Sequence, residues 1–206
     1  MARVDIERTS LGERVLHWMT ALSFLYCFLS GLGIAFPKLK WLLEVLGGGE
    51  FSAWLHRWSG VIFVFCVVRM YLWWRKDMRM SDDDRTWLAN VKYYVSGRSD
   101  KLPETGKYNA GQKVYAWIVF LASPLLVLSG LLMWFPEAFP KTFARYAVLV
   151  HELVFIGIGS GFIVHFYMGT IGLPGTLSSM ITGRVSAAWA QSHHRKWFKE
   201  ITKRAG

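Results

Sequence analysis

Four long apolar stretches separated by polar connections dominate the pattern of this 206-residue chain. A helix that crosses the hydrocarbon core of a bilayer needs about 20 mostly apolar residues. The pattern predicts such helices over residues of about 15–36, 52–74, 112–135 and 143–173. We therefore expect an all-α integral membrane four-helix bundle that forms one domain over residues 1–206.

The polar connections mark where the helices end. Pro37 stops the first helix, because proline cannot continue the hydrogen-bond ladder, whereas Pro124 inside the third helix is tolerated where neighbouring helices satisfy the freed carbonyl. A polar loop over residues 75–111 follows the second helix, and a basic tail over residues 174–206 ends the chain. Within the loop, residues 87–95 have an amphipathic spacing that suits either the membrane surface or a packed connector helix.

The first apolar stretch follows Arg3, Arg8 and Arg14 and superficially resembles a secretory signal peptide. It is longer than the usual apolar region of such a peptide, and no clear A-x-A cleavage site follows it. We therefore expect this stretch to be a retained transmembrane helix.

Composition supports a membrane protein and argues against nucleic acid as a partner. The chain is 53% hydrophobic and 16% aromatic, which fits a protein whose solvent is lipid. Its net charge of +10 comes from Lys and Arg residues that lie between and beyond the apolar segments, not along one exposed face. Cys27 and Cys66 lie inside apolar runs without a C-x-x-C pair, so we expect two buried, unpaired thiols.

The distribution of basic residues predicts the orientation, because positively charged loops stay in the cytoplasm. Eighteen Lys and Arg residues lie in the N-terminal segment, the connection after the second helix and the tail. The two opposite loops hold only four, namely Lys38, Lys40, Lys141 and Arg145. Both termini are therefore predicted to be cytoplasmic.

Four of the six histidines lie in the predicted helices, where ionisable groups are costly and are candidates for function. His17 lies at the cytoplasmic start of the first helix, and His56 lies near the outer start of the second. On the fourth helix, His151 and His165 are fourteen residues apart, so they share a face and stand about 21 Å apart along the axis. Depth then pairs His17 with His165, and His56 with His151.

Each pair supplies two neutral imidazoles, which are the usual axial ligands of a six-coordinate haem. Small residues would make room for the flat ring; candidates are Gly31, Gly157, Gly159 and Gly161. For any single glycine, close helix packing is the better interpretation. Zinc or copper would also accept imidazole, but apart from Glu152 beside His151 no cysteine or carboxylate completes a compact coordination sphere.

Other charged residues have two interpretations. Arg69 lies thirteen residues after His56 and is either a partner of a haem propionate or a side chain that extends to the interface. Arg57 is close enough to the outer interface that extension into it is favoured. His193 and His194 lie in the basic tail, where we expect solvation, or contact with lipid or a partner, and not haem ligation.

These residues resemble the gamma subunits, cytochrome b556, of membrane-bound formate dehydrogenases over nearly the whole chain. The most specific motif is G-K-Y-N-A-G-Q-K over residues 106–113, since the histidine spacing alone would also admit hydrogenase cytochromes b. The other matching motifs are L-H-W at 16–18, L-H at 55–56, His151, H-F-Y-M at 165–168 and H-H-R-K-W at 193–197.

The resemblance implies two haems b, one held by His17 and His165 on the cytoplasmic side and one held by His56 and His151 on the periplasmic side. It also implies a menaquinone or ubiquinone site beside the cytoplasmic haem, near Asn109, Gln112 and His165. Helix capping is a second role for Asn109 and Gln112, and both roles can coexist.

The chain departs from the family at two positions near the outer haem. Arg57 and Glu152 stand where the family leads us to expect uncharged residues. The potential of that haem, or proton traffic near it, can therefore differ from that of family members.

The resemblance further implies the quinone-reducing subunit of a respiratory formate dehydrogenase in the bacterial inner membrane. Electrons would come from an iron–sulfur beta subunit on the periplasmic side. Formate oxidation would belong to a molybdenum or tungsten alpha subunit, with trimerisation of the whole complex as a further option. The alternatives are a cytochrome b subunit of a hydrogenase or other periplasmic oxidoreductase, a cofactor-free membrane anchor or assembly factor, and a metal-ion transporter.

Overall fold

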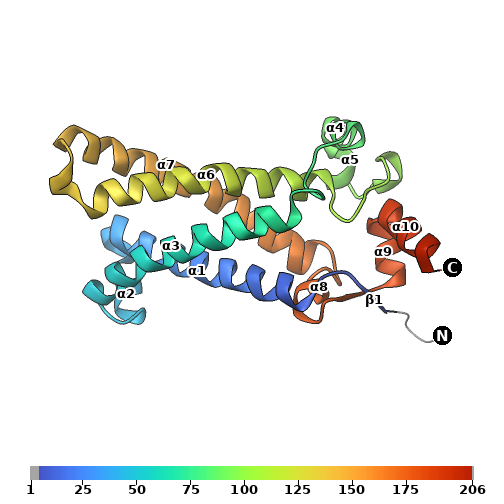
Figure 1. The fold of residues 1–206 in the computed structure, drawn as a ribbon, viewed down its shortest axis with the longest axis horizontal. Coiled ribbons are helices and arrows are strands. Elements are labelled where there is room, and N and C mark those ends of the chain that lie inside the picture. The colour runs from blue at the N-terminus through green and yellow to red at the C-terminus, as the bar shows by residue number, and fades with distance from the viewer. Residues whose placement is uncertain (1–4, 206) are drawn as a thin grey trace. The chain divides into compact units, whose positions relative to one another are not determined.

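Four long helices dominate the computed structural model, which describes residues 5–205 (Figure 1). They are α1 (Leu11–Ala35), α3 (Gly49–Trp74), α6 (Ala110–Trp134) and α7 (Lys141–Tyr167), the last continued by the π-helical turn η4 (Met168–Gly172). Each is long and apolar enough to cross a membrane. The predicted membrane helical bundle is therefore confirmed. Arg3 lies outside the described residues.

Short elements connect and flank the four helices. Before and between them lie β1 (Asp5–Glu7), η1 (Pro37–Leu39), α2 (Trp41–Val45), α4 (Asp82–Ala89), α5 (Val91–Val95), η2 (Ser99–Lys101) and η3 (Pro136–Ala138). After them lie α8 (Ser178–Ile181), β2 (Arg184–Ser186), α9 (Ala187–His193) and α10 (Arg195–Ala205).

Local capping explains why two of the long helices begin earlier than the apolar pattern predicted. Ser10 precedes α1, and its hydroxyl accepts a bond from the backbone N–H of Glu13 at 3.3 Å. The Glu13 carboxylate in turn accepts a bond from the backbone N–H of Ser10 at 2.7 Å, which completes a capping box. Asn109 and Gln112 form the equivalent pair at the start of α6. Polar capping residues carry no hydropathy signal, so the pattern placed these helix starts too late.

The contacts group the chain into two compact units. The bundle unit contains residues 15–72 and 118–164, and the loop-and-tail unit contains residues 5–14, 73–117 and 165–205. The expectation of one domain over residues 1–206 stays a prediction.

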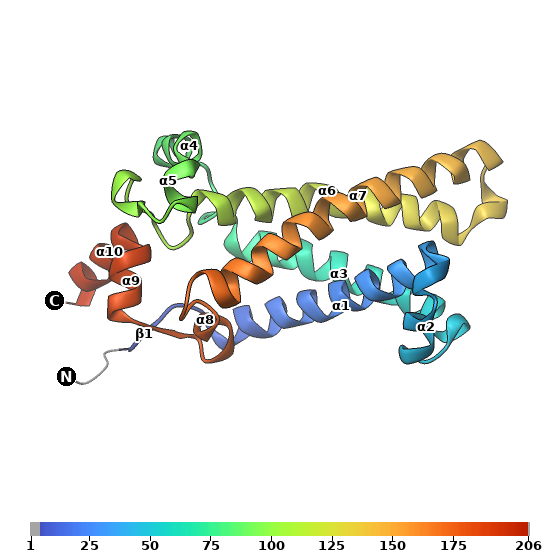
Figure 2. The same cartoon turned by 180° about the vertical axis from the view of Figure 1, so that it is seen from behind.

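Aromatic side chains form the core of the bundle unit. Phe24 of α1, Phe63 and Val67 of α3 and Ile158 of α7 are buried together. The ring centroids of Phe24 and Phe162 are 5.0 Å apart, a separation typical of favourable aromatic pairs. Figure 2 shows the same long helices from behind. This core holds α1, α3 and α7 together.

Gly159 has a packing role in this core. A Cβ atom added there would lie 2.9 Å from Cε2 of Phe28, which is too close for an ordinary contact. A Cβ added at Gly157 would meet nothing within 4 Å. Close packing therefore explains Gly159, whereas Gly157 faces open space.

The predicted basic tail is folded into the loop-and-tail unit. Strand β2 pairs antiparallel with β1, with Asp5 opposite Ser186 and Glu7 opposite Arg184. Helices α9 and α10 bury Trp189, Ala190 and Trp197 together with Val185. The amphipathic face of α10 supplies this core, and its charged residues face outward.

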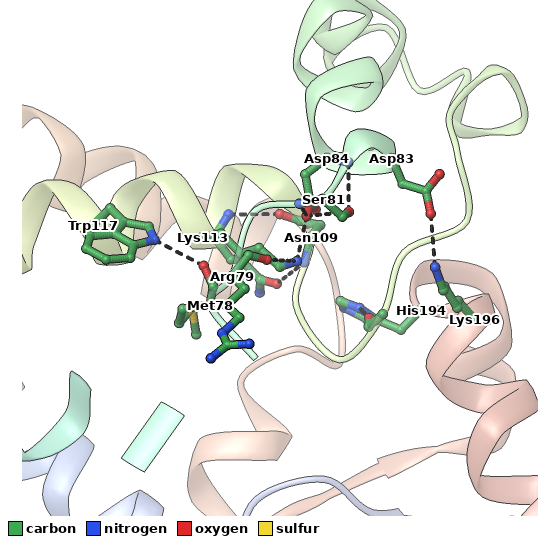
Figure 3. Close-up of polar contacts among 12 residues, drawn as sticks. Met78, Arg79, Ser81, Asp83, Asp84, Asn109, Lys113, Trp117, His194 and Lys196 are labelled. Carbon is green, nitrogen blue, oxygen red and sulfur yellow. Dashed lines mark hydrogen bonds and ion pairs between the residues drawn. The ribbon is translucent and has the colours of Figure 1, made fainter. Parts of the chain in front are cut away.

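The loop over residues 75–111 is ordered by polar contacts (Figure 3). Lys113 of α6 donates to the Asp84 carboxylate at 2.7 Å and to the carbonyl of Arg79 at 3.1 Å. Burial acts to raise the pKa of Asp84, but hydrogen bonds from Lys113 and Ser81 outweigh it and hold the pKa below its usual value.

The predicted helix over residues 87–95 is divided between α4 and α5, and Trp87 is buried, as a packed connector requires.

Gly183 closes a tight contact in the loop-and-tail unit, and its replacement tests that contact. Its φ of +82° favours glycine, and an added Cβ would overlap the Arg14 guanidinium and lie 2.6 Å from the carbonyl oxygen of Thr9. We expect Gly183→Ala to destabilise the protein by about 2–4 kcal/mol in thermal unfolding.

Gly97 offers a matched control, since its φ is +72° and an added Cβ would meet nothing within 4 Å. Gly97→Ala should cost only the backbone strain of about 1 kcal/mol. Equal losses of stability in the two variants would contradict the role of the Gly183 contact.

Candidate functional site

The bundle unit brings His56 and His151 together. His56 lies on α3 and His151 lies on α7, and both side chains are half-buried. Their ring centroids are 6.4 Å apart, with ring planes inclined by 50°. The sequence predicted this pair from depth alone, and the structure has the two rings facing one site.

Each of these rings is bonded to a serine of a neighbouring helix. His56 Nδ1 lies 2.9 Å from Oγ of Ser30 on α1, and His151 Nδ1 lies 2.9 Å from Oγ of Ser129 on α6. Such bonds fix the orientation of an imidazole, and they leave its Nε2 as the metal-binding nitrogen. The sequence analysis missed both serines.

The geometry of the pair fits a metal ion held from two sides. Two imidazoles on opposite sides of one first-row metal ion, each bound at about 2 Å, have ring centres roughly 6 Å apart. The described part of the chain has no group of three or more His, Cys, Asp or Glu residues that could hold a metal. Two protein ligands and no more suit a haem, because the porphyrin supplies the remaining ligands.

His17 and His165 belong to different units, so their pairing stays a prediction. His17 is half-buried on α1 and makes an edge contact with Trp18, with centroids 5.6 Å apart. His165 stacks on Tyr115 with centroids 5.0 Å apart and planes inclined by 22°. Arg69 is exposed on α3, and its role at a haem propionate also stays a prediction.

Asn109 and Gln112 form a reciprocal cap at the start of α6. The side-chain oxygen of Asn109 accepts a bond from the backbone N–H of Gln112 at 2.9 Å, and that of Gln112 accepts one from the backbone N–H of Asn109 at 3.0 Å. The predicted capping role is therefore confirmed for both residues. Their predicted role at a quinone is not tested by these bonds.

The two unusual charges of the bundle unit differ in their surroundings. The Arg57 guanidinium lies 5.2 Å from the ring of Trp134 in a cation–π contact. Glu152 is exposed on α7 next to His151. Arg57 therefore has an aromatic partner, and its extension into the membrane interface stays a prediction.

The G-K-Y-N-A-G-Q-K motif over residues 106–113 contacts the buried Arg8 and the Glu13 carboxylate. The sequence analysis did not predict these contacts. Arg8 is only 5% exposed; it donates to the carbonyl of Lys107 at 2.6 Å and lies 4.6 Å over the ring of Trp189. Burial lowers the pKa of Arg8 to about 10, so the guanidinium stays charged near neutral pH. The Glu13 carboxylate accepts bonds from Trp74 at 2.6 Å and from Lys107 at 3.2 Å.

The expectation that His194 is solvated or in contact with lipid or a partner was wrong. Its side chain is 2% exposed, and its Nδ1 lies 2.7 Å from the carbonyl oxygen of Gly106. Figure 3 shows this histidine at the start of α10. Basic neighbours in the sequence suggested exposure, but the folded tail buries the imidazole against Trp189.

Four apolar helices and an imidazole pair inside the bundle unit define an integral membrane protein with the architecture of a membrane cytochrome. The model of the prokaryotic cytochrome b561 family matches residues 8–183. The chain therefore belongs to the prokaryotic cytochrome b561 family, and this membership implies b-type haem as its cofactor.

Three relatives carry names that describe their complexes. The cytochrome b556(fdo) subunit of formate dehydrogenase from Escherichia coli K12 is 32% identical over 205 residues, which cover 98% of this chain and 95% of that protein. The cytochrome b556(Fdn) subunit of the nitrate-inducible enzyme from the same strain is 31% identical over 96% of this chain and 92% of its own length. The formate dehydrogenase cytochrome b556 subunit of Haemophilus influenzae is 30% identical over 97% of this chain and 87% of its own length.

Because His194 is buried, we expect the stability of the folded protein to depend on pH. Burial, with a smaller contribution from the charge of Arg8, lowers the pKa of His194 to about 3, although the bond to Gly106 opposes this. Between pH 6.5 and 3 the unfolded chain binds a proton that the folded chain does not, so stability falls as the pH falls. We expect a slope of up to about 1.4 kcal/mol per pH unit from this group in thermal unfolding below pH 6.5.

His194→Gln is the matched control, because its amide can still donate to the Gly106 carbonyl but does not titrate. It should flatten the decline between pH 7 and 5, leaving the part due to His193 and the carboxylates. An unchanged slope in this variant would show that His194 is not the group responsible.

Proposed function

We propose that this chain is the membrane cytochrome b subunit of a respiratory formate dehydrogenase in the bacterial inner membrane, with two haems b. His56 and His151 would hold one haem, and His17 and His165 would hold the other. The observation that carries the proposal is the pair of imidazoles 6.4 Å apart within the bundle unit. The names of the relatives, each a formate dehydrogenase subunit, support the choice of complex over a hydrogenase.

The distribution of charge supports an orientation with both termini in the cytoplasm. In that orientation His56 and His151 lie toward the periplasm, and His17 and His165 lie toward the cytoplasm. Electrons would then enter at the periplasmic side from an iron–sulfur beta subunit and leave at the cytoplasmic side to quinone. Bound haem supplies the one-electron chemistry, and the histidines of this chain hold and orient it.

The division of labour in the complex follows from what this chain contains. It has two cysteines, both in the membrane-spanning segments, which are too few for an iron–sulfur cluster held by four thiolates. Formate oxidation would therefore belong to a molybdenum or tungsten alpha subunit, and the heterotrimer is a candidate for assembly as a trimer. This chain would act as the quinone-reducing subunit of that complex.

The capping pair of α6 supports a quinone site at the cytoplasmic membrane edge. Asn109 and Gln112 use their side-chain oxygens for the cap, so their amide N–H groups are not needed by it, and the amide of Asn109 also interacts with the Tyr94 hydroxyl. An amide N–H can donate to a quinone carbonyl, and a site at the membrane edge gives water access for the two protons that accompany two electrons. Menaquinone or ubiquinone would bind there, near His165.

Haem content tests the four ligands. Purified protein should contain two haems b per chain in a pyridine haemochrome assay, and each of His17→Ala and His151→Ala should reduce that number to one. The reason is that the loss of one axial imidazole removes half of the protein's ligands to one iron.

His193→Ala is the matched control, since His193 lies in α9 and has no proposed ligand role; it should retain two haems. Protein without haem, or no loss in the two ligand variants, would overturn the assignment and favour the cofactor-free membrane anchor.

Asn109→Asp separates a quinone role from capping. Aspartate caps a helix as well as asparagine does, so the start of α6 should be retained, and the loss of the amide interaction with Tyr94 should lower thermal stability by only about 1 kcal/mol. The variant lacks the amide donor, so re-oxidation of the reduced haem by a soluble menaquinone or ubiquinone analogue should slow by about 5- to 10-fold, in keeping with the loss of one hydrogen bond. Re-oxidation at the wild-type rate would confine Asn109 to capping.

A further inference from the structure

The sequence L-S-G-L occurs twice in the bundle unit, at residues 29–32 of α1 and at residues 128–131 of α6. Each copy faces one histidine of the His56–His151 pair. In both copies the serine Oγ lies 2.9 Å from the histidine Nδ1. The glycine that follows faces Cε1 of the same ring, since an added Cβ would lie 3.4 Å from that atom at Gly31 and 3.6 Å at Gly130.

The serine bonds along each helix determine which atom carries the proton. Ser30 donates its hydroxyl to the carbonyl of Tyr26 at 2.6 Å, and Ser129 donates to the carbonyl of Leu125 at 2.6 Å. A serine has a single hydroxyl proton, so toward histidine each Oγ can only accept. His56 and His151 therefore carry their protons on Nδ1, and the backbone carbonyls of Cys27 and Leu126 are further hydrogen-bond partners of the two rings.

We propose that Ser30 and Ser129 are positioning residues for the haem between His56 and His151, an inference that rests on the proposed function. By accepting from Nδ1–H, each serine fixes the tautomer whose Nε2 lone pair is free to bind iron. The same bond increases the electron donation of the imidazole and holds the ring in one orientation. The two copies act on both axial ligands alike.

The adjacent glycines complete this contact. A Cβ at Gly31 would lie 3.4 Å from the His56 ring, at the close limit of ordinary van der Waals contact, and one at Gly130 would lie in ordinary contact with the His151 ring at 3.6 Å. Gly31 was expected to make room for the haem ring, and its contact in the structure is with His56, a proposed ligand of that haem. The L-S-G-L copies therefore combine an acceptor for Nδ1–H with a glycine backbone that lies against the edge of the ring.

Removal of one serine hydroxyl should change the haem and not only the fold. In Ser30→Ala or Ser129→Ala the histidine imidazole would donate less electron density to the haem iron. The ferric haem would then lose more stabilisation than the ferrous haem, so the midpoint potential of that haem should rise. We expect about a tenfold loss in haem affinity. If the ferric form alone lost this tenfold affinity, the potential would rise by about 59 mV, so we expect a rise of up to about 59 mV.

The experiment is a potentiometric titration of the purified protein that follows the visible spectra of the haems. Matched controls are Ser23→Ala in α1 and Ser123→Ala in α6, because these buried serines also donate to the carbonyl four residues earlier, at 2.8 and 2.6 Å. One of the two haem components should shift upward in the L-S-G-L variants, and neither should shift in the controls. Ser30→Thr and Ser129→Thr retain the hydroxyl and should restore the wild-type potential.

The outcomes separate this inference from the proposed function. If His56→Ala and His151→Ala lose a haem but the serine variants titrate like their controls, the inference fails and the haem ligands stand. If the histidine variants keep both haems, the proposed site itself fails. Should an alanine variant load no haem, recovery of loading and potential by its threonine counterpart would support the inference, and failure to recover would overturn it.

Discussion

The constraint on which the bundle depends is that polar groups inside a bilayer must be satisfied by the protein itself. Histidines in the spans would be costly if their ring nitrogens met only lipid. Ser30 and Ser129 remove much of that cost for His56 and His151, and each serine is itself satisfied by a carbonyl of its own helix. In the proposed haem site, the same bonds that make the imidazoles tolerable in lipid would also prepare them to bind iron.

The loop-and-tail unit surrounds a buried charge of its own with a hydrogen-bond acceptor and aromatic rings. Arg8 is buried, but its guanidinium donates to Lys107 and lies over aromatic rings. Lys107 in turn donates to Glu13, the residue whose carboxylate completes the capping box of α1. The motif over residues 106–113 thus ties the N-terminal segment and the tail together and also begins α6, which explains physically why so many polar residues gather in one short run.

Periodicity and hydropathy predicted the four long helices, and helical geometry predicted that His56 and His151 meet, because depth in a membrane is nearly a function of sequence position. Tertiary contacts that do not follow from depth in the membrane were not predictable in this way. His194 stands in a basic run that indicates exposure, yet the core of Trp189 and Trp197 buries it. The serines of L-S-G-L look like ordinary small residues of a membrane helix, and only their distance from a histidine gives them a function.

The two L-S-G-L copies suggest how the haem site forms. Ser30 orients His56 from the preceding long helix, and Ser129 orients His151 in the same way, so each ligand is aligned within its own pair of helices. The aromatic contacts of Phe24 and Phe28 with Phe162 connect the two pairs. Because a ligand that binds only the packed state stabilises that state, haem should strengthen the contact between the pairs. Alignment of each ligand before packing reduces the ordering that haem binding itself must impose.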